Sequence, residues 1–257
     1  MRALPDLSRR STEAEIMDTA VTTFAEFDEC LRQIEAVNNL TLGYRPVLSW
    51  LKERLPSVSS EVSLTIIDIG CGRGEMLRQI WSWTKKQKIN VNLTGIDINP
   101  WSTASAEKST PKNMGIYYKT SDIFEMNTTE KYDFIISTHF THHLGNDELI
   151  RFLQWMDSHA LQGWFINDLH RHKAPYLFIK YILSILPINK MSRNDGPLSV
   201  ARAFTADEWQ KILQQAGIPS AQFSIRWFFP FRYGIARWKP EQTERLTGKE
   251  PTSPSMR

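Results

Sequence analysis

The pattern of apolar and polar positions changes character near residue 60. Up to that point, apolar residues recur every three or four positions, which predicts two helices within 12–56, the second ending before Pro56. Beyond it, short β-branched runs alternate with amphipathic stretches. Strands are predicted at 63–70, 90–99, 115–124, 132–140 and 163–170, with helices at 74–87, 100–109 and 146–160. Asn146 is the expected N-cap of the last of these helices. We expect an α/β fold built on a Rossmann-like, doubly wound sheet.

The last third of the chain departs from this rhythm. Residues 174–204 are largely apolar, and the Asp-Gly-Pro at 195–197 predicts a turn. Thr205 and Glu208 predict the start of a helix that Gly217 ends, and 221–239 predicts an antiparallel strand pair. We expect three parts in chain order: an N-terminal helical cap (1–58), a main domain (59–240) with a lid insertion after the fifth strand (about 172–204), and a flexible tail (241–257).

Composition narrows the class of protein. A length of 257 residues and 41% hydrophobic content suit one large domain with an added cap. The net charge of +3 is far from that of a dedicated nucleic-acid binder. Cys30 and Cys71 are too few for a disulfide framework or a Cys-x-x-Cys metal site. The first residues lack the apolar core of a signal peptide, and no apolar stretch reaches about 18 residues, so a cytoplasmic protein is expected.

A glycine loop follows the first predicted strand. Gly70, Gly72 and Gly74 allow a ligand to approach the backbone closely, and the helix behind them presents free N–H groups. The dinucleotide fingerprint would require glycine where this chain has Glu75. A different ligand is therefore favoured.

Two carboxylates indicate what that ligand carries. Asp68, two residues before the loop, would repel a pyrophosphate but suits an ammonium group. Asp97, at the end of the second strand, is placed to accept hydrogen bonds from ribose hydroxyls. A ligand with a ribose, an amino group and a carboxylate, but no phosphate, is S-adenosylmethionine.

With these motifs, residues 60–240 resemble the class I S-adenosylmethionine-dependent methyltransferases that act on small molecules. "DIGCGRG" (68–74) resembles the first motif of that family, "SDIFEM" (121–126) the third, and "YDFIISTHFTHHL" (132–144) its fourth strand with the loop where the methyl group meets the substrate. The resemblance implies a seven-stranded sheet with its last strand antiparallel. It also implies a cofactor site made of Asp68, Gly70, Cys71, Gly72, Gly74, Asp97, Ile98, Asp122, Ile123, Thr138 and His139.

Five of the six histidines follow two predicted strands, in the segments 139–143 and 170–172. If those strands are neighbours, both groups face one crevice. The imidazoles can pack, act as a general base, or hold a metal ion together with Asp168. We expect no metal, because adjacent histidines rarely point the same way. His143 is the preferred base and His142 the second choice.

The acceptor is less defined. The apolar stretch 174–188 can form the lid of an apolar pocket or contact a membrane peripherally, and "NDGPLSVARAF" (194–204) resembles segments of methyltransferases of secondary metabolism. His170, Arg202 and Tyr44 are the candidate substrate contacts. We expect O-methylation of a small apolar phenolic or quinol-like molecule. C- or N-methylation, an RNA methyltransferase and a non-catalytic scaffold are the alternatives, but no nucleic-acid partner is expected, since the loop lacks the Asn/Asp-Pro-Pro-aromatic motif.

Overall fold

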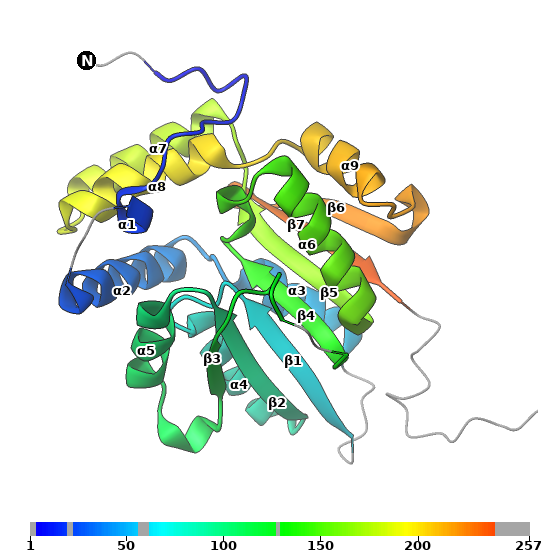
Figure 1. Ribbon diagram of the computed structural model, residues 1–257. Coiled ribbons are helices and arrows are strands. Elements are labelled where there is room, and N and C mark those ends of the chain that lie inside the picture. Colours follow the sequence, from blue (N-terminus) through cyan, green and yellow to red (C-terminus); the bar gives the residue numbers. More distant parts are fainter. Residues whose placement is uncertain (1–3, 20–22, 56–61, 127–128, 240–257) are drawn as a thin grey trace, which may run out of the picture.

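A mixed β-sheet forms the centre of the protein (Figure 1). The structure, a computed structural model, describes residues 4–19, 23–55, 62–126 and 129–239. Within them seven strands pair in the order β3-β2-β1-β4-β5-β7-β6, and β7 runs opposite to the other six. The expected sheet, with its last strand antiparallel, is confirmed. The strands are β1 (Ser63–Ile69), β2 (Asn90–Asp97), β3 (Tyr117–Thr120), β4 (Tyr132–Thr138), β5 (Ala160–Leu169), β6 (Phe223–Phe228) and β7 (Arg232–Trp238).

Helices cover both faces of the sheet, because its central strands are apolar on both sides. In β1, Leu64 and Ile66 belong to one core layer, while Ile67 and Ile69 belong to the other, as the two-residue period of a strand requires. The first layer is closed by α3 (Arg45–Arg54), α4 (Glu75–Gln87) and α5 (Pro100–Ser109), and the second by α6 (Asn146–His159) and α9 (Ala206–Gln215). Helix α3, which the sequence places in the cap, thus packs against the sheet.

Four further helices lie above the carboxyl ends of the parallel strands (Figure 1). They are α1 (Ile16–Thr19), α2 (Phe24–Leu40), α7 (Lys173–Ile185) and α8 (Lys190–Arg202). In the described part of the chain, no helix is both long and apolar enough to cross a membrane.

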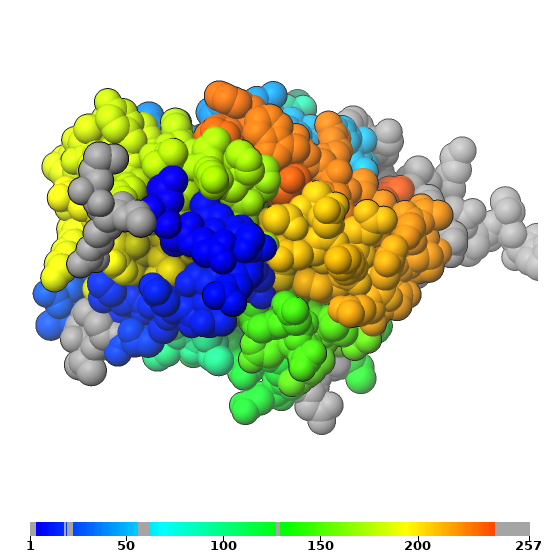
Figure 2. Space-filling view, turned by 90° about the horizontal axis from the view of Figure 1, so that it is seen from above, coloured from blue at the N-terminus to red at the C-terminus, as the bar shows by residue number. Residues whose placement is uncertain are grey.

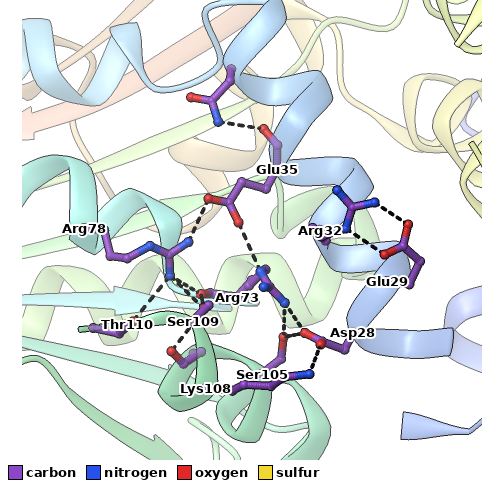
Figure 3. A network of polar contacts seen from close by, with 12 residues as sticks. Asp28, Glu29, Arg32, Glu35, Arg73, Arg78, Ser105, Lys108, Ser109 and Thr110 are labelled. Carbon is purple, nitrogen blue, oxygen red and sulfur yellow. Dashed lines mark hydrogen bonds and ion pairs between the residues drawn. The ribbon is translucent and has the colours of Figure 1, made fainter. Parts of the chain in front are cut away.

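Helix α2 is attached to the glycine loop by a group of charges (Figure 3). Arg73 in the loop forms ion pairs with Asp28 and Glu35 of α2. Glu35 also accepts a hydrogen bond from Arg78 at 2.8 Å, and Lys108 of α5 donates to Asp28 at 2.7 Å. Because Arg73, Asp28, Glu35 and Arg78 are largely buried and only Lys108 is exposed, removing one of the four would leave an uncompensated charge. The network therefore fixes α2 over the loop.

Two local predictions are wrong. The turn expected at 195–197 is absent, since α8 continues through Pro197. Gly196 serves packing instead: a Cβ there would lie 2.3 Å from Leu183 of α7. The N-cap of α6 is Gly145 rather than Asn146, because Glu148 accepts the hydrogen bond of the Gly145 N–H at 2.8 Å.

The predicted capping box of α9, from Thr205 to Glu208, is confirmed. The predicted tail at 241–257 lies outside the described residues.

Candidate functional site

A cavity of about 630 Å³ lies between the carboxyl ends of the parallel strands and the helices above them. Ligands of open α/β sheets bind at this position. Its walls differ in chemistry: the glycine loop and the ends of β2 and β4 contribute polar groups, whereas α2 and α7 contribute apolar side chains. A ligand that combines a polar group with an apolar group would match both walls.

The glycine loop leaves its backbone open to the cavity. Gly70 and Gly72, at φ +70° and +52°, have the left-handed conformation that favours glycine, and both line the cavity together with Cys71. A Cβ on Gly70 would collide with Phe140, but nothing lies within 4 Å of the Cβ position at Gly72. The loop can therefore be approached closely at Gly72.

Gly74, the third predicted cofactor glycine, is not part of the cavity wall. Its φ is +75°, and a Cβ would lie 2.2 Å from the Tyr118 hydroxyl, which shares a hydrogen bond of 2.9 Å with Thr110. We expect Gly74→Ala to lower the free energy of unfolding by about 1–3 kcal/mol, through backbone strain and the displacement of Tyr118. Urea denaturation measures this loss.

Gly115→Ala is the matched control for that substitution. Its φ is +63°, but no atom lies within 4 Å of its Cβ position. It should show the backbone strain alone, so equal losses in both variants would contradict a role for the collision with Tyr118.

The acidic residues at the end of β2 and after β3 form the adjoining wall. Asp97 accepts hydrogen bonds from the N–H groups of Gly72 and Asn99, both at 2.9 Å, and so ties the loop to β2. Asp122 accepts one from Phe124 at 2.8 Å. Both carboxylates line the cavity, as do their neighbours Ile98 and Ile123. Their contacts with ribose and adenine stay predictions.

Three buried polar atoms at this end of the cavity have no hydrogen-bond partner within the described residues: Asp68 Oδ1, Glu75 Oε2 and Thr138 Oγ1. Burial raises the pKa of Asp68 well above its usual range, and the charges of Glu75 and Asp97 raise it further. Burial also raises the pKa of Glu75 to about 7. Buried carboxylates need a cationic partner. The ammonium and sulfonium groups of S-adenosylmethionine meet that need, so the residues present fit this cofactor.

A buried carboxylate fixes the orientation of His142. The Nδ1 atom of His142 lies 2.8 Å from Asp168 Oδ1, and the other Asp168 oxygen accepts hydrogen bonds from the His142 N–H and the Thr141 hydroxyl. Burial alone would raise the pKa of Asp168, but the charge and hydrogen bond of His142 outweigh it and hold that pKa well below its usual range. Asp168 is thus ionised and accepts the Nδ1 proton, which points Nε2 of His142 to the opposite side of the ring.

Glu15 joins both histidines, and sequence reasoning missed it. Its Oε1 lies 3.7 Å from Nε2 of His142, and its Oε2 lies 4.0 Å from Nε2 of His143. The side chain is buried, and the Ser199 hydroxyl donates to Oε1 at 2.8 Å. Glu15 lies in a polar N-terminal stretch without a motif, so only the fold reveals its position.

The N-terminal segment that carries Glu15 is held at both ends. The N–H groups of Ile16 and Met17 donate to the buried carboxylate of Asp195 at 2.9 and 3.0 Å. Arg10 donates to the carbonyl oxygens of His142 and Leu144 at 3.1 and 2.9 Å. These contacts hold residues 10–17 in a fixed position across the turn that carries His142 and His143.

His142 and His143 do not point apart, although the sequence-based exclusion of a metal ion assumed that they would. Their rings lie 4.3 Å from each other, and both Nε2 atoms face Glu15. Glu15, His142 and His143 offer ligand atoms within 4.8 Å of one another. This group can move a proton or hold a divalent cation.

His139 has a different environment from its two neighbours. It lines the cavity with a φ of +54°, and Arg232 donates to its Nε2 at 3.1 Å. Burial and the charge of Arg232 lower the pKa of His139 to about 3. It stays neutral near pH 7 and acts as a hydrogen-bond acceptor rather than a base.

The three predicted substrate residues have other surroundings. Arg202 lines the cavity, but its guanidinium donates to the carbonyl oxygens of His142 and His143 at 3.3 and 3.2 Å, which supports their turn. Tyr44 is buried in the core, where its hydroxyl donates to the Glu35 carbonyl at 3.3 Å. Neither Tyr44 nor His170 lines the cavity.

The expectation that both histidine groups face one crevice is therefore wrong. The His170 N–H donates to the Phe231 carbonyl at 3.1 Å, and its ring packs between His172 and Tyr233. Pairing with the chain before β7 holds His170 away from the cavity. The residue of the fifth strand that faces His142 is Asp168, near the end of β5.

The part of the wall formed by α2 and α7 is mainly apolar, whereas α8 also adds polar residues such as Asp195, Ser199 and Arg202. Helices α2, α7 and α8 contribute aromatic and aliphatic side chains: Phe27, Leu31, Ile34, Val37, Phe178, Ile179, Leu183 and Val200. Ligand pockets are commonly lined in this way, with few polar groups that fix orientation.

Sequence comparison identifies the family. A family model described as a methyltransferase domain matches residues 43–218, which is more than half of the chain. The match begins just before α3, in agreement with the packing of that helix on the sheet. No curated protein sequence matches the chain.

Solved structures share the fold at low sequence identity. Magnesium protoporphyrin IX methyltransferase from Synechocystis, with bound S-adenosylhomocysteine, is 17% identical, with a TM-score of 0.51 over 86% of this chain and 89% of that one. Human N-acetylserotonin methyltransferase is 15% identical, with a TM-score of 0.56 over 82% and 55%. The plantazolicin methyltransferase BpumL is 18% identical, with a TM-score of 0.52 over 86% and 87%.

Proposed function

We propose that this chain, which belongs to the methyltransferase-domain family and is an S-adenosylmethionine-dependent methyltransferase, methylates a hydroxyl oxygen of a small apolar acceptor of the phenol or quinol type. The observation that carries the proposal is the position of His143. His143 lines the same cavity as the glycine loop and Asp97. Through Glu15, which Ser199 contacts, it also adjoins the wall formed by α8.

The chain's own residues have distinct tasks in this reaction. S-adenosylmethionine supplies the electrophilic methyl group. His143 accepts the proton of the acceptor hydroxyl, because a phenol is a poor nucleophile while protonated. Glu15 stabilises the resulting imidazolium. Asp168 fixes the ring of His142, and this ring packs against that of His143.

The apolar wall supports an apolar acceptor. Alignment of the hydroxyl with the methyl group depends on how the rest of the molecule is held, and much of the rate comes from that alignment. The side chains of α2 and α7 can hold an aromatic ring or an alkyl chain, but they offer no charged group for a phosphate or a nucleic-acid backbone.

A labelled-methyl assay tests this proposal. With 4-alkylphenols and alkylhydroquinones, we expect labelled product, and kcat/KM should rise by about fourfold per added methylene until the cavity is filled. Alkylbenzenes without a hydroxyl are the matched control and should give none. Transfer to amines or RNA but to no phenol would contradict the proposal.

The convergence of Glu15, His142 and His143 favours one second candidate, metal-assisted O-methylation. A chelator distinguishes the two, since proton removal by His143 should continue unchanged in EDTA. Loss of transfer in EDTA, restored by a divalent cation, would favour the metal-assisted reaction.

A further inference from the structure

Half of the large apolar side chains that are exposed in the described residues gather on two segments. Six of the twelve lie on α7 or near the end of β6 and in the turn that follows it, and we call them the apolar patch: Leu177, Phe178, Tyr181, Ile185, Trp227 and Phe229. Phe231 joins the two segments, since its ring centroid lies 5.5 Å from that of Phe178 and 6.3 Å from that of Trp227. Figure 2 shows the start of α7 next to these strands. The patch is therefore continuous.

Helix α7 is apolar on two opposite sides. Ile179 and Leu183 face the cavity, whereas Leu177, Tyr181 and Ile185 are 47%, 65% and 61% exposed. The spacing of four residues places each set on one side of the helix. A helix that is apolar all round normally has apolar surroundings, so the exposed side requires an apolar partner.

The charges around the patch indicate which partner this is. Lys173, Lys180, Lys190 and Arg193 are all exposed, and the only acidic residue of α7 and α8 is the buried Asp195. Apolar side chains flanked by lysine and arginine are typical of segments that lie in the interface of an anionic membrane. A second copy of this chain would bring the same cations together and repel itself.

The patch also borders the acceptor side of the cavity. Phe178 belongs to the patch and lines the cavity, and Phe231, which joins the two parts of the patch, lines it as well. A molecule bound at the patch is thus separated from the cavity only by side chains such as Phe178.

We propose that the apolar patch binds the surface of an anionic lipid bilayer, and that the apolar acceptor passes from the bilayer into the cavity beside Phe178. Binding to the bilayer is independent of the reaction. Only the entry route rests on the proposed function, and the two are measured separately.

Flotation with vesicles tests the binding. The full chain should float with vesicles of phosphatidylcholine and phosphatidylserine, and less with phosphatidylcholine alone. Tyr181→Glu should weaken binding by about tenfold or more, because it removes apolar area and adds a negative charge. Lys180→Gln should weaken it by about fivefold, and added salt should reduce this difference.

Tyr117→Glu is the matched control, since Tyr117 is 63% exposed but lies on the edge strand β3. It should bind as the unchanged protein does. No flotation of the unchanged protein, equal losses in both tyrosine variants, or a dimer that Tyr181→Glu dissociates would each overturn the binding proposal.

Transfer to two acceptors tests the entry route. Tyr181→Glu should slow methylation of a long-chain alkylphenol held in vesicles by about tenfold, as binding falls, but leave that of a short, water-soluble phenol unchanged. Equal rates on the vesicle-held acceptor would overturn the route. Absence of any transfer would contradict the proposed function, while flotation would still decide the binding.

Discussion

His143→Ala is expected to lower the rate of methyl transfer by about 10²- to 10⁴-fold, the usual contribution of a general base. The reason is geometric: His143 lines the cavity and has Glu15 4.0 Å from its Nε2 to stabilise the proton it receives. Affinity for S-adenosylmethionine should be nearly unchanged, because the glycine loop, Asp68 and Asp97 stay intact. Single-turnover rates and calorimetry measure the two effects.

Two companion variants sharpen this prediction. Glu15→Gln keeps the size and the hydrogen bond with Ser199 but removes the charge, so it should also slow transfer, and rates should depend on pH differently from those of the unchanged protein. His159→Ala, at the end of α6 and outside the cavity wall, is the control and should have no effect. Intact transfer in His143→Ala, or lost cofactor binding, would contradict the assignment.

Asp68→Asn is expected to change stability and cofactor affinity in opposite directions. Asp68 is buried, and its Oδ1 has no partner within the described residues. Without cofactor, removing this charge should raise the free energy of unfolding by about 1–3 kcal/mol near pH 8. With cofactor, the variant loses the charge that faces the ammonium group, and the Kd should rise by about 10²-fold.

The stability effect of Asp68→Asn has a defined pH dependence. Burial raises the pKa of Asp68 in the folded state, so the unchanged protein loses stability as the pH rises above the usual range of a carboxyl group. The advantage of the variant should therefore grow with pH and vanish near pH 4. Urea denaturation at several pH values, with the exposed Glu107→Gln as control, measures it; a variant less stable at high pH would refute this account.

The apolar pattern was sufficient to predict the α/β fold class, and the family resemblance added the seven-stranded sheet with its last strand antiparallel. Short β-branched runs such as 63–70 predict buried strands, and apolar residues that recur every three or four positions predict helices. The glycine loop with Asp68 and Asp97 was recognisable because these residues stand at the ends of two predicted strands, where the sequence itself marks their position. Local turn chemistry was misleading at 195–197, where packing of Gly196 against Leu183 outweighs the preference for a turn.

The acceptor side of the site could not be predicted, because tertiary contacts create it. Glu15 reaches His142 and His143 only because Arg10 and Asp195 fix the N-terminal segment across them. Tertiary contacts also decide in which direction a side chain points after the end of a strand. Sequence alone suggested that His170 faces the cavity, but pairing with the chain before β7 turns it away.

The position of the transferred methyl group tests the central claim most directly. An alkylhydroquinone offers both oxygen and ring carbon to the same cavity, so the product made with ¹³C-methyl-labelled S-adenosylmethionine can be assigned by NMR. Proton removal by His143 predicts that the label appears as a methoxy group, and that His143→Ala forms little of it. A label on the ring carbon, or a methoxy product formed equally fast without His143, would contradict the account.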